Sequence, residues 1–286
     1  MDLTNKAIIK ELLEKYNAKP EKYLGQHFIL SKNALLKMIA AAEIKKSDTI
    51  VEIGPGPGAL TRELAKTGAQ IIAIEKDPLM IEILKETTAD FKNVKIVRAD
   101  ARQLSVSDTD RKGDKMGINL GKAGYKIVAN LPYNIATFLI RSWLESENPP
   151  EKMVLMIQKE VAQRMVARPP RMNLLGASVQ FYADAKIVGY VPKEMFWPRP
   201  KVESAIIKLI PKEKPASETA SAFFSAVKAG FSQPRKQLLG NLSKKLNLPR
   251  DELLKIFQDF NIPAAARAEN LDLNQWLKLA AKLIHK

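Results

Sequence analysis

Residues 51–60, with the sequence VEIGPGPGAL, determine the fold class expected for this chain. An apolar run over residues 49–53 ends in three glycines that alternate with two prolines, and apolar residues at helical spacing follow. This order predicts a strand, a tight turn and a helix, the first unit of an open α/β sheet whose ligand binds beyond the strand's carboxyl end. Because glycine permits positive φ and a close approach of ligand to backbone, we expect Gly54 to line a binding site.

The turn differs from a dinucleotide-binding fingerprint in two respects. Its third glycine follows after one residue instead of two, and Pro55 and Pro57 lack the N–H groups that would bind a pyrophosphate. The turn therefore suits a ligand without phosphates, and it resembles that of S-adenosylmethionine-dependent methyltransferases. A plain tight turn is the alternative, to be decided by the residues downstream.

Two carboxylates follow at the ends of the next two predicted strands. Glu75 ends a buried run over residues 70–75, where it can accept hydrogen bonds from ribose hydroxyls. Asp100 follows the strand predicted over residues 94–98, and it can accept a hydrogen bond from an adenine amine. Taken alone, each carboxylate is more simply a solvated surface group. Together with the glycines they predict an adenosine-shaped site across three strand ends.

A fourth predicted strand, residues 126–129, runs into Asn130-Leu131-Pro132-Tyr133. An adenine N6 amine is a poor nucleophile because its lone pair is delocalised, so an enzyme must hold both of its N–H groups. The Asn130 side-chain oxygen and the Leu131 carbonyl can accept these two hydrogen bonds. Pro132 fixes the backbone and Tyr133 can stack on the base. No strong general base is needed, because a sulfonium donor is already activated and alignment lowers the barrier. An ordinary strand-to-helix turn is the alternative.

Composition narrows the class of partner and site. The 46 Lys and Arg against 31 Asp and Glu give a net charge of +15, which favours a polyanionic partner such as nucleic acid. A generally basic surface is the alternative, and net charge alone does not separate the two. The absence of cysteine and the presence of only two histidines exclude disulfides and zinc sites. We expect a cytoplasmic protein, because no apolar run is long enough to span a membrane and no signal-peptide pattern is present.

Two further segments each have two possible roles, and a third has no assigned function. The aromatic and polar mixture at residues 23–30 is either a clasp over a ligand or a staple onto the core. The loop at residues 195–202, with Phe196 and nearby basic residues, is either a base-stacking lip or a rigid proline-rich connection. Residues 105–124 are polar and aperiodic, and they predict a mobile loop without an assigned function.

Six motifs together resemble one family, the KsgA-type ribosomal RNA adenine N6,N6-dimethyltransferases, over nearly the whole chain. They are GQHF at 25–28, VEIGPG at 51–56, NLPY at 130–133, QKEVAQR at 158–164, FWPRPKVES at 196–204 and RAENL at 267–271.

The resemblance implies a Rossmann-like class I methyltransferase sheet of seven strands followed by a small all-helical domain. Runs at 152–157, 185–191 and 204–210 supply the remaining three strands. A proline-containing linker at 211–217 separates a methyltransferase domain, residues 1–211 with an N-terminal extension, from a helical RNA-recognition domain, residues 212–286. Basic residues in the latter are expected to contact phosphates.

The resemblance also implies a role for each site residue. Cofactor binding falls to His27, Ile29, Gly54, Glu75, Asp100 and Asn130, and handling of the target base falls to Asn130, Leu131, Pro132, Tyr133 and Phe196, which would stack on the other face of the base. The family usually has asparagine where this chain has His27.

By this resemblance, the chain dimethylates N6 of two adjacent adenosines in a loop near the 3′ end of 16S ribosomal RNA. The methyl donor would be S-adenosylmethionine, and the partner a 30S subunit precursor bound by a monomer without metal or membrane. One alternative is a 23S ribosomal RNA adenine dimethyltransferase, which Arg267-Ala268-Glu269 disfavours. Another is a non-catalytic RNA-binding assembly or transcription factor on the same fold, which the intact Asn130 and Tyr133 disfavour.

Overall fold

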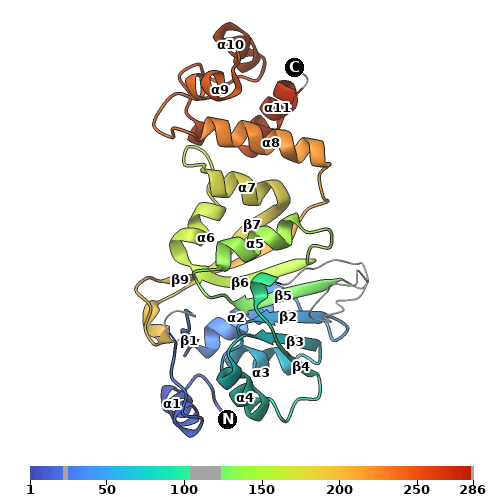
Figure 1. Ribbon diagram of the computed structural model, residues 1–286, viewed down its shortest axis with the longest axis vertical. Helices are drawn as coiled ribbons and strands as arrows, with labels where there is room; N and C mark the ends of the chain where they lie inside the picture. Colours follow the sequence, from blue (N-terminus) through green and yellow to red (C-terminus); the bar gives the residue numbers. More distant parts are fainter. Residues whose placement is uncertain (22–24, 104–123, 285–286) are drawn as a thin grey trace. The chain divides into compact units, whose positions relative to one another are not determined.

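The computed structural model describes residues 1–21, 25–103 and 124–284 (Figure 1). The chain forms two compact units, one of residues 1–162 with 186–211 and one of residues 163–185 with 212–286. The sequence predicts one boundary near Pro211, whereas here residues 163–185 group with the C-terminal helices. The loop predicted at 105–124 lies, apart from Gly124, outside the described residues. None of the described helices has the length and apolar character needed to cross a membrane.

A seven-stranded sheet forms the centre of the first unit, with the strand order β4-β3-β2-β5-β6-β9-β7. The five strands from β4 to β6 pair in parallel, and β9 pairs antiparallel with β6. The seven-stranded α/β sheet expected from the sequence is confirmed. The strands are β2 (Thr49–Ile53), β3 (Gln70–Glu75), β4 (Val94–Arg98), β5 (Tyr125–Asn130), β6 (Lys152–Gln158), β7 (Ala183–Val191) and β9 (Ser204–Pro211).

The helices precede, connect and follow these strands. Their local signals are clear at α4, where Pro78 stands at the first position and the Asp77 carboxylate accepts from the Leu79 N–H over 2.9 Å. The α-helices are α1 (Lys6–Lys15), α2 (Lys32–Ala42), α3 (Ala59–Ala65), α4 (Pro78–Thr87), α5 (Ala136–Glu145), α6 (Lys159–Met165), α7 (Leu174–Tyr182), α8 (Ser217–Gly230), α9 (Leu238–Leu246), α10 (Arg250–Asp259) and α11 (Leu273–Ile284). Short 3₁₀ turns are η2 (Ala101–Gln103), η3 (Lys193–Met195) and η4 (Ala268–Asn270).

Helices α2 and α3 cover one face of the sheet. Their buried apolar side chains pack against alternate residues of the central strands, as expected for a sheet face that is excluded from water. The residues of this cluster include Leu35, Met38, Leu60, Leu64, Ile50, Val128, Val154 and Ile206, all at most 2% exposed. This rigid layer holds the carboxyl ends of β2, β3 and β5 in place.

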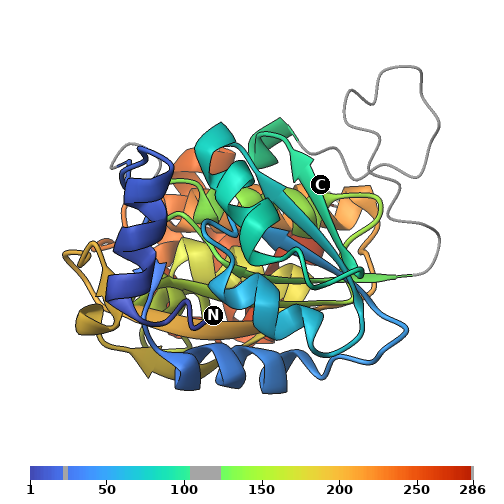
Figure 2. The same ribbon diagram turned by 90° about the horizontal axis from the view of Figure 1, so that it is seen from below.

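A two-stranded antiparallel ribbon joins β1 (Phe28–Ile29) to β8 (Phe196–Trp197). Phe28 packs in a small core with Ile9 and Leu13 of α1 and Met80 of α4. Figures 1 and 2 show α1, in dark blue, beside α4, in teal. The ribbon thus brings a segment near the start of the chain next to one far along it.

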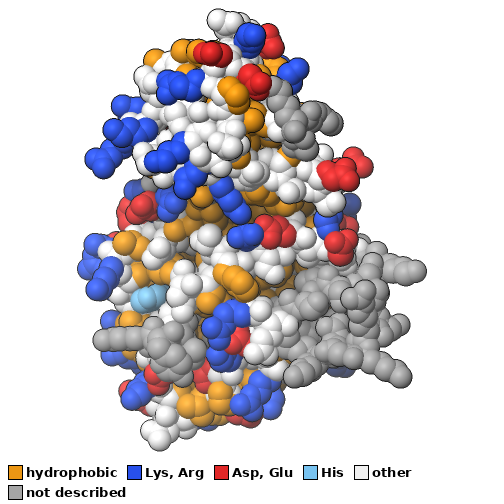
Figure 3. All heavy atoms as spheres, turned by 45° about the horizontal axis from the view of Figure 1, so that its top comes forward, with side chains coloured by type: hydrophobic (Ala, Val, Ile, Leu, Met, Phe, Trp, Pro, Cys, Tyr) orange, Lys and Arg blue, Asp and Glu red, His pale blue; other side chains and the backbone are white. Residues whose placement is uncertain are grey.

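The second unit has its own aromatic core. The rings of Phe181 in α7 and Phe223 in α8 stack with centroids 4.2 Å apart, and Trp276 of α11 is fully buried. The exposed side chains of this unit include many Lys and Arg residues. Figure 3 shows one face of the molecule, with Lys and Arg side chains in blue.

Candidate active site

The glycine turn after β2 approaches the end of β3. The Gly54 N–H donates to the Ile74 carbonyl over 2.9 Å, and the Gly56 N–H donates to the Glu75 carboxylate over 3.2 Å. Gly54 has a φ of 65°, and a Cβ there would lie 3.6 Å from the Pro132 ring. Glycine adopts this conformation readily, and without a Cβ it leaves the space beyond the carboxyl ends of β2 and β5 open.

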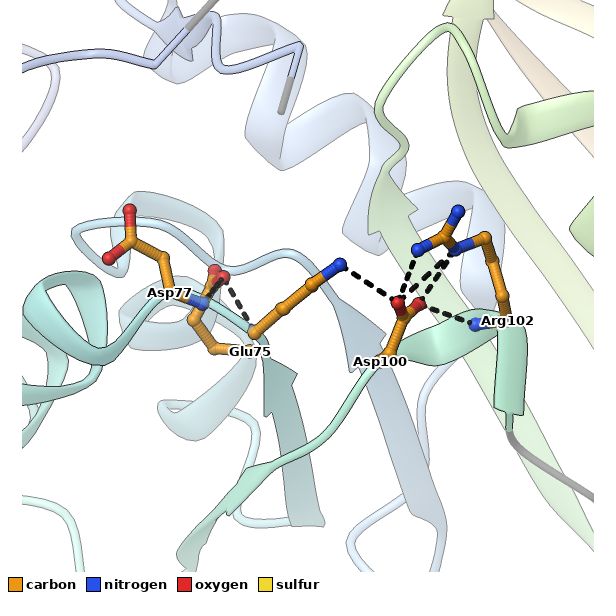
Figure 4. A network of polar contacts seen from close by, with 5 residues as sticks. Glu75, Asp77, Asp100 and Arg102 are labelled. Carbon is orange, nitrogen blue, oxygen red and sulfur yellow. Dashed lines mark hydrogen bonds and ion pairs between the residues drawn. The ribbon is translucent and has the colours of Figure 1, made fainter. Parts of the chain in front are cut away.

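Glu75 is buried at the carboxyl end of β3, with 7% of its surface exposed. Its carboxylate accepts from the Gly56 N–H over 3.2 Å. It also accepts from the N–H groups of Lys76 and Asp77 over 2.8 and 2.9 Å (Figure 4). Burial raises the pKa of Glu75, and the three N–H groups oppose this shift. The donors fix the orientation of a carboxylate that still has lone pairs for ligand hydroxyls.

Asp100, which follows β4, is held by two cations. The Arg102 guanidinium donates through Nη2 and Nε over 2.6 and 3.0 Å, and Lys76 Nζ lies 3.0 Å from the same carboxylate (Figure 4). The hydrogen bonds from Arg102 hold the pKa of Asp100 well below its usual range. Asp100 is therefore ionised, and an adenine amine would share its oxygens with these two cations.

Asn130, the last residue of β5, contacts the N-terminal segment. Its side-chain Nδ2 donates to the backbone carbonyl of His27 over 3.1 Å, which leaves Oδ1 as an acceptor. Next along the chain, the Leu131 N–H donates to the Met156 carbonyl over 3.1 Å, so β6 fixes the backbone at the start of the Asn-Leu-Pro-Tyr turn.

Two rings lie beside this turn. The rings of His27 and Tyr133 stack with centroids 5.6 Å apart and an interplanar angle of 28°. His27 Nδ1 donates to the Pro198 carbonyl over 2.6 Å, and the Tyr133 hydroxyl lies 2.6 Å from the Ser204 hydroxyl. Burial raises the pKa of Tyr133, so its phenol stays protonated and acts as an apolar face with one anchored polar end.

A single cavity of about 250 Å³ brings the predicted residues together. Those that line it are His27, Ile29, Gly54, Glu75, Asp100, Asn130, Leu131, Pro132 and Tyr133. Residues from the ends of β2, β3, β4 and β5 and from the N-terminal segment thus share one space, as the adenosine-shaped site requires. Among the described residues, no group of three or more acidic or histidine side chains is placed to hold a metal ion.

Phe196 is the one predicted site residue that the structure does not bring to this cavity. It is 3% exposed, its backbone pairs with Ile29 in the ribbon, and its ring belongs to the core cluster beside Val191 and Ile206. The ring is thus packed in the core of the free enzyme, and its stacking role stays a prediction.

The N-terminal segment combines the two interpretations that the sequence left open. Residues 25–29 line the cavity, while Phe28 and Ile29 are buried in the core. Gln26 anchors the segment, because its Nε2 donates to the Asp77 carboxylate over 2.9 Å while its Oε1 accepts from the Glu21 N–H over 2.8 Å. Gln26 was not among the predicted site residues, since a lone polar residue carries no signal of a partner so distant in the chain.

Three charged residues that line the cavity were not among the predicted site residues, namely Glu52, Lys76 and Arg102. Glu52 is 2% exposed, and its Oε2 has no hydrogen-bond partner among the residues that the structure describes. Burial raises the pKa of Glu52 to about 8, with a further contribution from Glu75. A charged residue inside an otherwise apolar strand was the available signal, because such a group is costly to bury without a purpose.

These side chains fit S-adenosylmethionine. The cavity offers carboxylates for ribose hydroxyls and an adenine amine, and open backbone at Gly54. It also holds the buried Glu52 carboxyl, whose Oε2 has no partner among the described residues, in a pocket that would receive a cation. The carboxylates that line the cavity, together with the glycine turn, distinguish this cavity from a phosphate-binding site.

Comparisons with known proteins agree with this geometry. The family described as "Ribosomal RNA adenine dimethylase" matches residues 3–285. Ribosomal RNA small subunit methyltransferase A of Dehalococcoides mccartyi (strain CBDB1) is 40% identical over 273 residues, covering 94% of this chain and 90% of that protein. The protein of the same name from Clostridioides difficile (strain 630) is 38% identical over 275 residues, covering 95% and 93%.

Solved structures show the same fold. A dimethyladenosine transferase from Plasmodium falciparum superposes with a TM-score of 0.73 at 28% identity, covering 89% of this chain and 96% of that one. The 23S rRNA methyltransferase ErmE gives a TM-score of 0.73 at 24% identity, covering 90% and 99%. This chain is an S-adenosylmethionine-dependent methyltransferase and belongs to the ribosomal RNA adenine dimethylase family.

Proposed function

We propose that this enzyme dimethylates N6 of two adjacent adenosines in a loop near the 3′ end of 16S ribosomal RNA. The observation that carries the proposal is the single cavity that Asn130 shares with Gly54, Glu75 and Asp100. An acceptor for a base amine thus lies in the same space as the acceptors for a nucleoside. The small-subunit target is supported by the names of relatives at 38–40% identity.

One side of the cavity, the donor side, binds S-adenosylmethionine and orients it. Glu75 accepts from the ribose hydroxyls and Asp100 from the adenine amine, while Gly54 lets the methionine part approach the backbone. His27 and Ile29 close the wall formed by the N-terminal segment. When bound, S-adenosylmethionine supplies a methyl group that is already activated by its sulfonium, so these residues need only align it.

The target side holds the base. The Asn130 Oδ1 and the Leu131 carbonyl accept the two N6–H groups, which directs the N6 lone pair toward the methyl carbon. Tyr133 stacks on the base, with its hydroxyl anchored at Ser204. As the N–C bond forms at the expense of the donor's S–CH3 bond, positive charge develops on N6, and the acceptors stabilise it until N6 loses one proton to solvent. After the first transfer the amine keeps one N–H, so one acceptor holds it during the second. A base from paired or stacked RNA is turned out to reach this space.

The second unit supplies RNA contacts in this proposal. Its exposed cations are suited to phosphates, whose contacts position an RNA without reading its bases. They include Arg235, Lys236, Lys244, Lys245 and Arg250. We place the reaction in the cytoplasm, on a 30S subunit precursor, with the enzyme acting as a monomer.

The test is mass spectrometry of ribosomal RNA after incubation with enzyme and methyl donor. Undermethylated 30S particles should gain N6,N6-dimethyladenosine at two adjacent positions near the 3′ end of 16S RNA, and 23S RNA should gain none. Labelling of 23S RNA alone would overturn the small-subunit target. RNA binding without any methylation would identify a non-catalytic factor instead.

A further inference from the structure

Glu52 lies on β2 directly beneath the glycine turn. Its backbone is in register with Ala73 of β3, and its side chain lies beside Thr61 of α3. The residue lines the cavity and is 2% exposed, yet Oε2 has no hydrogen-bond partner among the described residues. A buried carboxyl with an unused oxygen is costly to keep unless a ligand completes its environment.

No cation of the cavity compensates Glu52 within the described residues. The neighbour whose charge acts on it is Glu75 on β3, which is also acidic. The other charged or titratable side chains that line the cavity are His27, Lys76, Asp100, Arg102 and Tyr133, whose phenol stays neutral. Lys76 and Arg102 both bind Asp100, and the His27 ring donates to the Pro198 carbonyl. The free pocket therefore favours the neutral carboxyl.

The methyl donor differs from its product in the charge that it brings to this space. S-adenosylmethionine carries a sulfonium and an ammonium against one carboxylate, so its net charge is positive. S-adenosylhomocysteine, left after methyl transfer, has lost the sulfonium charge. A cation close to a buried carboxyl favours the ionised form.

We propose that Glu52 is a positioning residue for the methyl donor, protonated in the free enzyme and ionised when the cationic donor enters, so that the pocket prefers donor over demethylated product. The inference rests on the donor pocket of the proposed function and not on its RNA target. The pKa of about 8 for buried Glu52 sets the direction of the effect. Below that pH the free carboxyl holds a proton, donor binding releases it, and donor affinity rises with pH until the carboxyl is ionised in both states.

The experiment is isothermal titration calorimetry of the full chain without RNA at pH 7, in phosphate and in Tris. These buffers differ in ionisation enthalpy, so the difference in heat counts protons released. We expect roughly one more proton released per S-adenosylmethionine by the wild type than by Glu52→Gln. The ligand's own ionisable groups release the same number of protons with either protein. The difference in proton release between wild type and Glu52→Gln therefore reports on Glu52. Glu52→Gln should bind the donor about tenfold more weakly, and the product within about twofold of wild type.

Asp100→Asn is the matched control. The pKa of Asp100 lies well below its usual range, so this carboxylate is ionised in the free and the bound state. Its removal should weaken donor and product to a similar degree and leave proton release unchanged. The proposal is overturned if Glu52→Gln releases as many protons as the wild type, or if its preference for donor over product is unaltered.

A pH series on the wild type keeps the proposal testable if Glu52→Gln does not fold. The ratio of product to donor dissociation constants should rise by about tenfold between pH 6.5 and 8. A ratio that stays flat would refute the proposal. Because no RNA is present, that result would leave methylation of 16S RNA to be judged by mass spectrometry.

Discussion

The side-chain amide of Asn130 donates a hydrogen bond of 3.1 Å to the backbone carbonyl of His27. This contact joins the end of β5 to the N-terminal segment across the cavity. It uses the N–H side of the amide, so that the oxygen is presented as an acceptor. Correct orientation of Asn130 therefore depends on a segment that is more than a hundred residues away in the chain.

Replacing Asn130 tests its role as an acceptor. Asn130→Ala should lower the methylation rate by about 10²- to 10³-fold, because one acceptor for the developing charge on N6 is lost. RNA affinity measured by filter binding should stay within about twofold, since phosphate contacts supply most of it. Methylation at the wild-type rate would refute the assigned role.

Arg102 competes with the donor's adenine for Asp100 in the free enzyme. Arg102→Ala should therefore tighten donor binding, by about three- to tenfold, as seen by calorimetry. Arg98→Ala removes another exposed cation, one that is not among the cavity-lining residues, and it should leave the affinity unchanged. Weaker binding in Arg102→Ala would show that the guanidinium assists the donor instead.

Alanine substitutions at Gly54 and Gly68 allow the effect of backbone strain to be separated from the effect of blocking the cavity. Both have positive φ, 65° and 79°, so alanine at either should cost about 1 kcal/mol of folding stability. Only Gly54 lines the cavity, whereas a Cβ at Gly68 would meet the flexible Lys46 side chain. Gly54→Ala should also weaken donor binding at least tenfold. Equal donor affinity in the two variants would mean that the donor does not approach Gly54.

Phe196 tests whether a buried ring also handles the base. Phe196→Ala should lower the free energy of unfolding by about 3–5 kcal/mol, since it leaves a cavity in the core. Phe196→Leu keeps most of the apolar volume, so we expect a stable protein that methylates at close to the wild-type rate. A large loss of turnover in a well-folded Phe196→Leu protein would support the stacking role.

Glu52 makes folding stability depend on pH. Its pKa is raised to about 8 in the folded chain from an ordinary value of 4.5, so both states are protonated below pH 4.5. Between pH 4.5 and 8 the unfolded chain binds fewer protons, and its ionisation lowers the stability of the fold by a few kcal/mol as pH rises. Chemical denaturation should show a smaller decline for Glu52→Gln than for wild type. Identical slopes would place Glu52 in a wetter environment.

Much of the fold follows from local patterns. The strands β2, β3, β5, β6 and β9 are mainly apolar runs, whereas charged residues interrupt β4 and β7. The glycine turn, Glu75 and Asp100 mark carboxyl ends of strands. Neighbouring parallel strands end at the same edge of the sheet, so the grouping of Gly54, Glu75, Asp100 and Asn130 could be anticipated from strand order alone.

What could not be predicted depends on contacts between distant parts of the chain. The β1–β8 ribbon has only two residues per strand, too few to show a period. Burial of Phe196 follows from that pairing, whereas an aromatic residue beside prolines and cations looks equally suited to a surface lip. Residues 163–185 join the second unit because α7 packs with α8 and α11, and no composition change marks this return.

The pairing of Phe28–Ile29 with Phe196–Trp197 also determines when the N-terminal wall of the cavity can form during translation. The strand that closes the cofactor wall leaves the ribosome early, but its partner follows more than 160 residues later, when over two-thirds of the chain has been translated. A nascent chain shorter than this has the glycine turn and the first carboxylates, yet lacks the partner strand that holds β1 in place. The enzyme therefore completes its own pocket only late in translation.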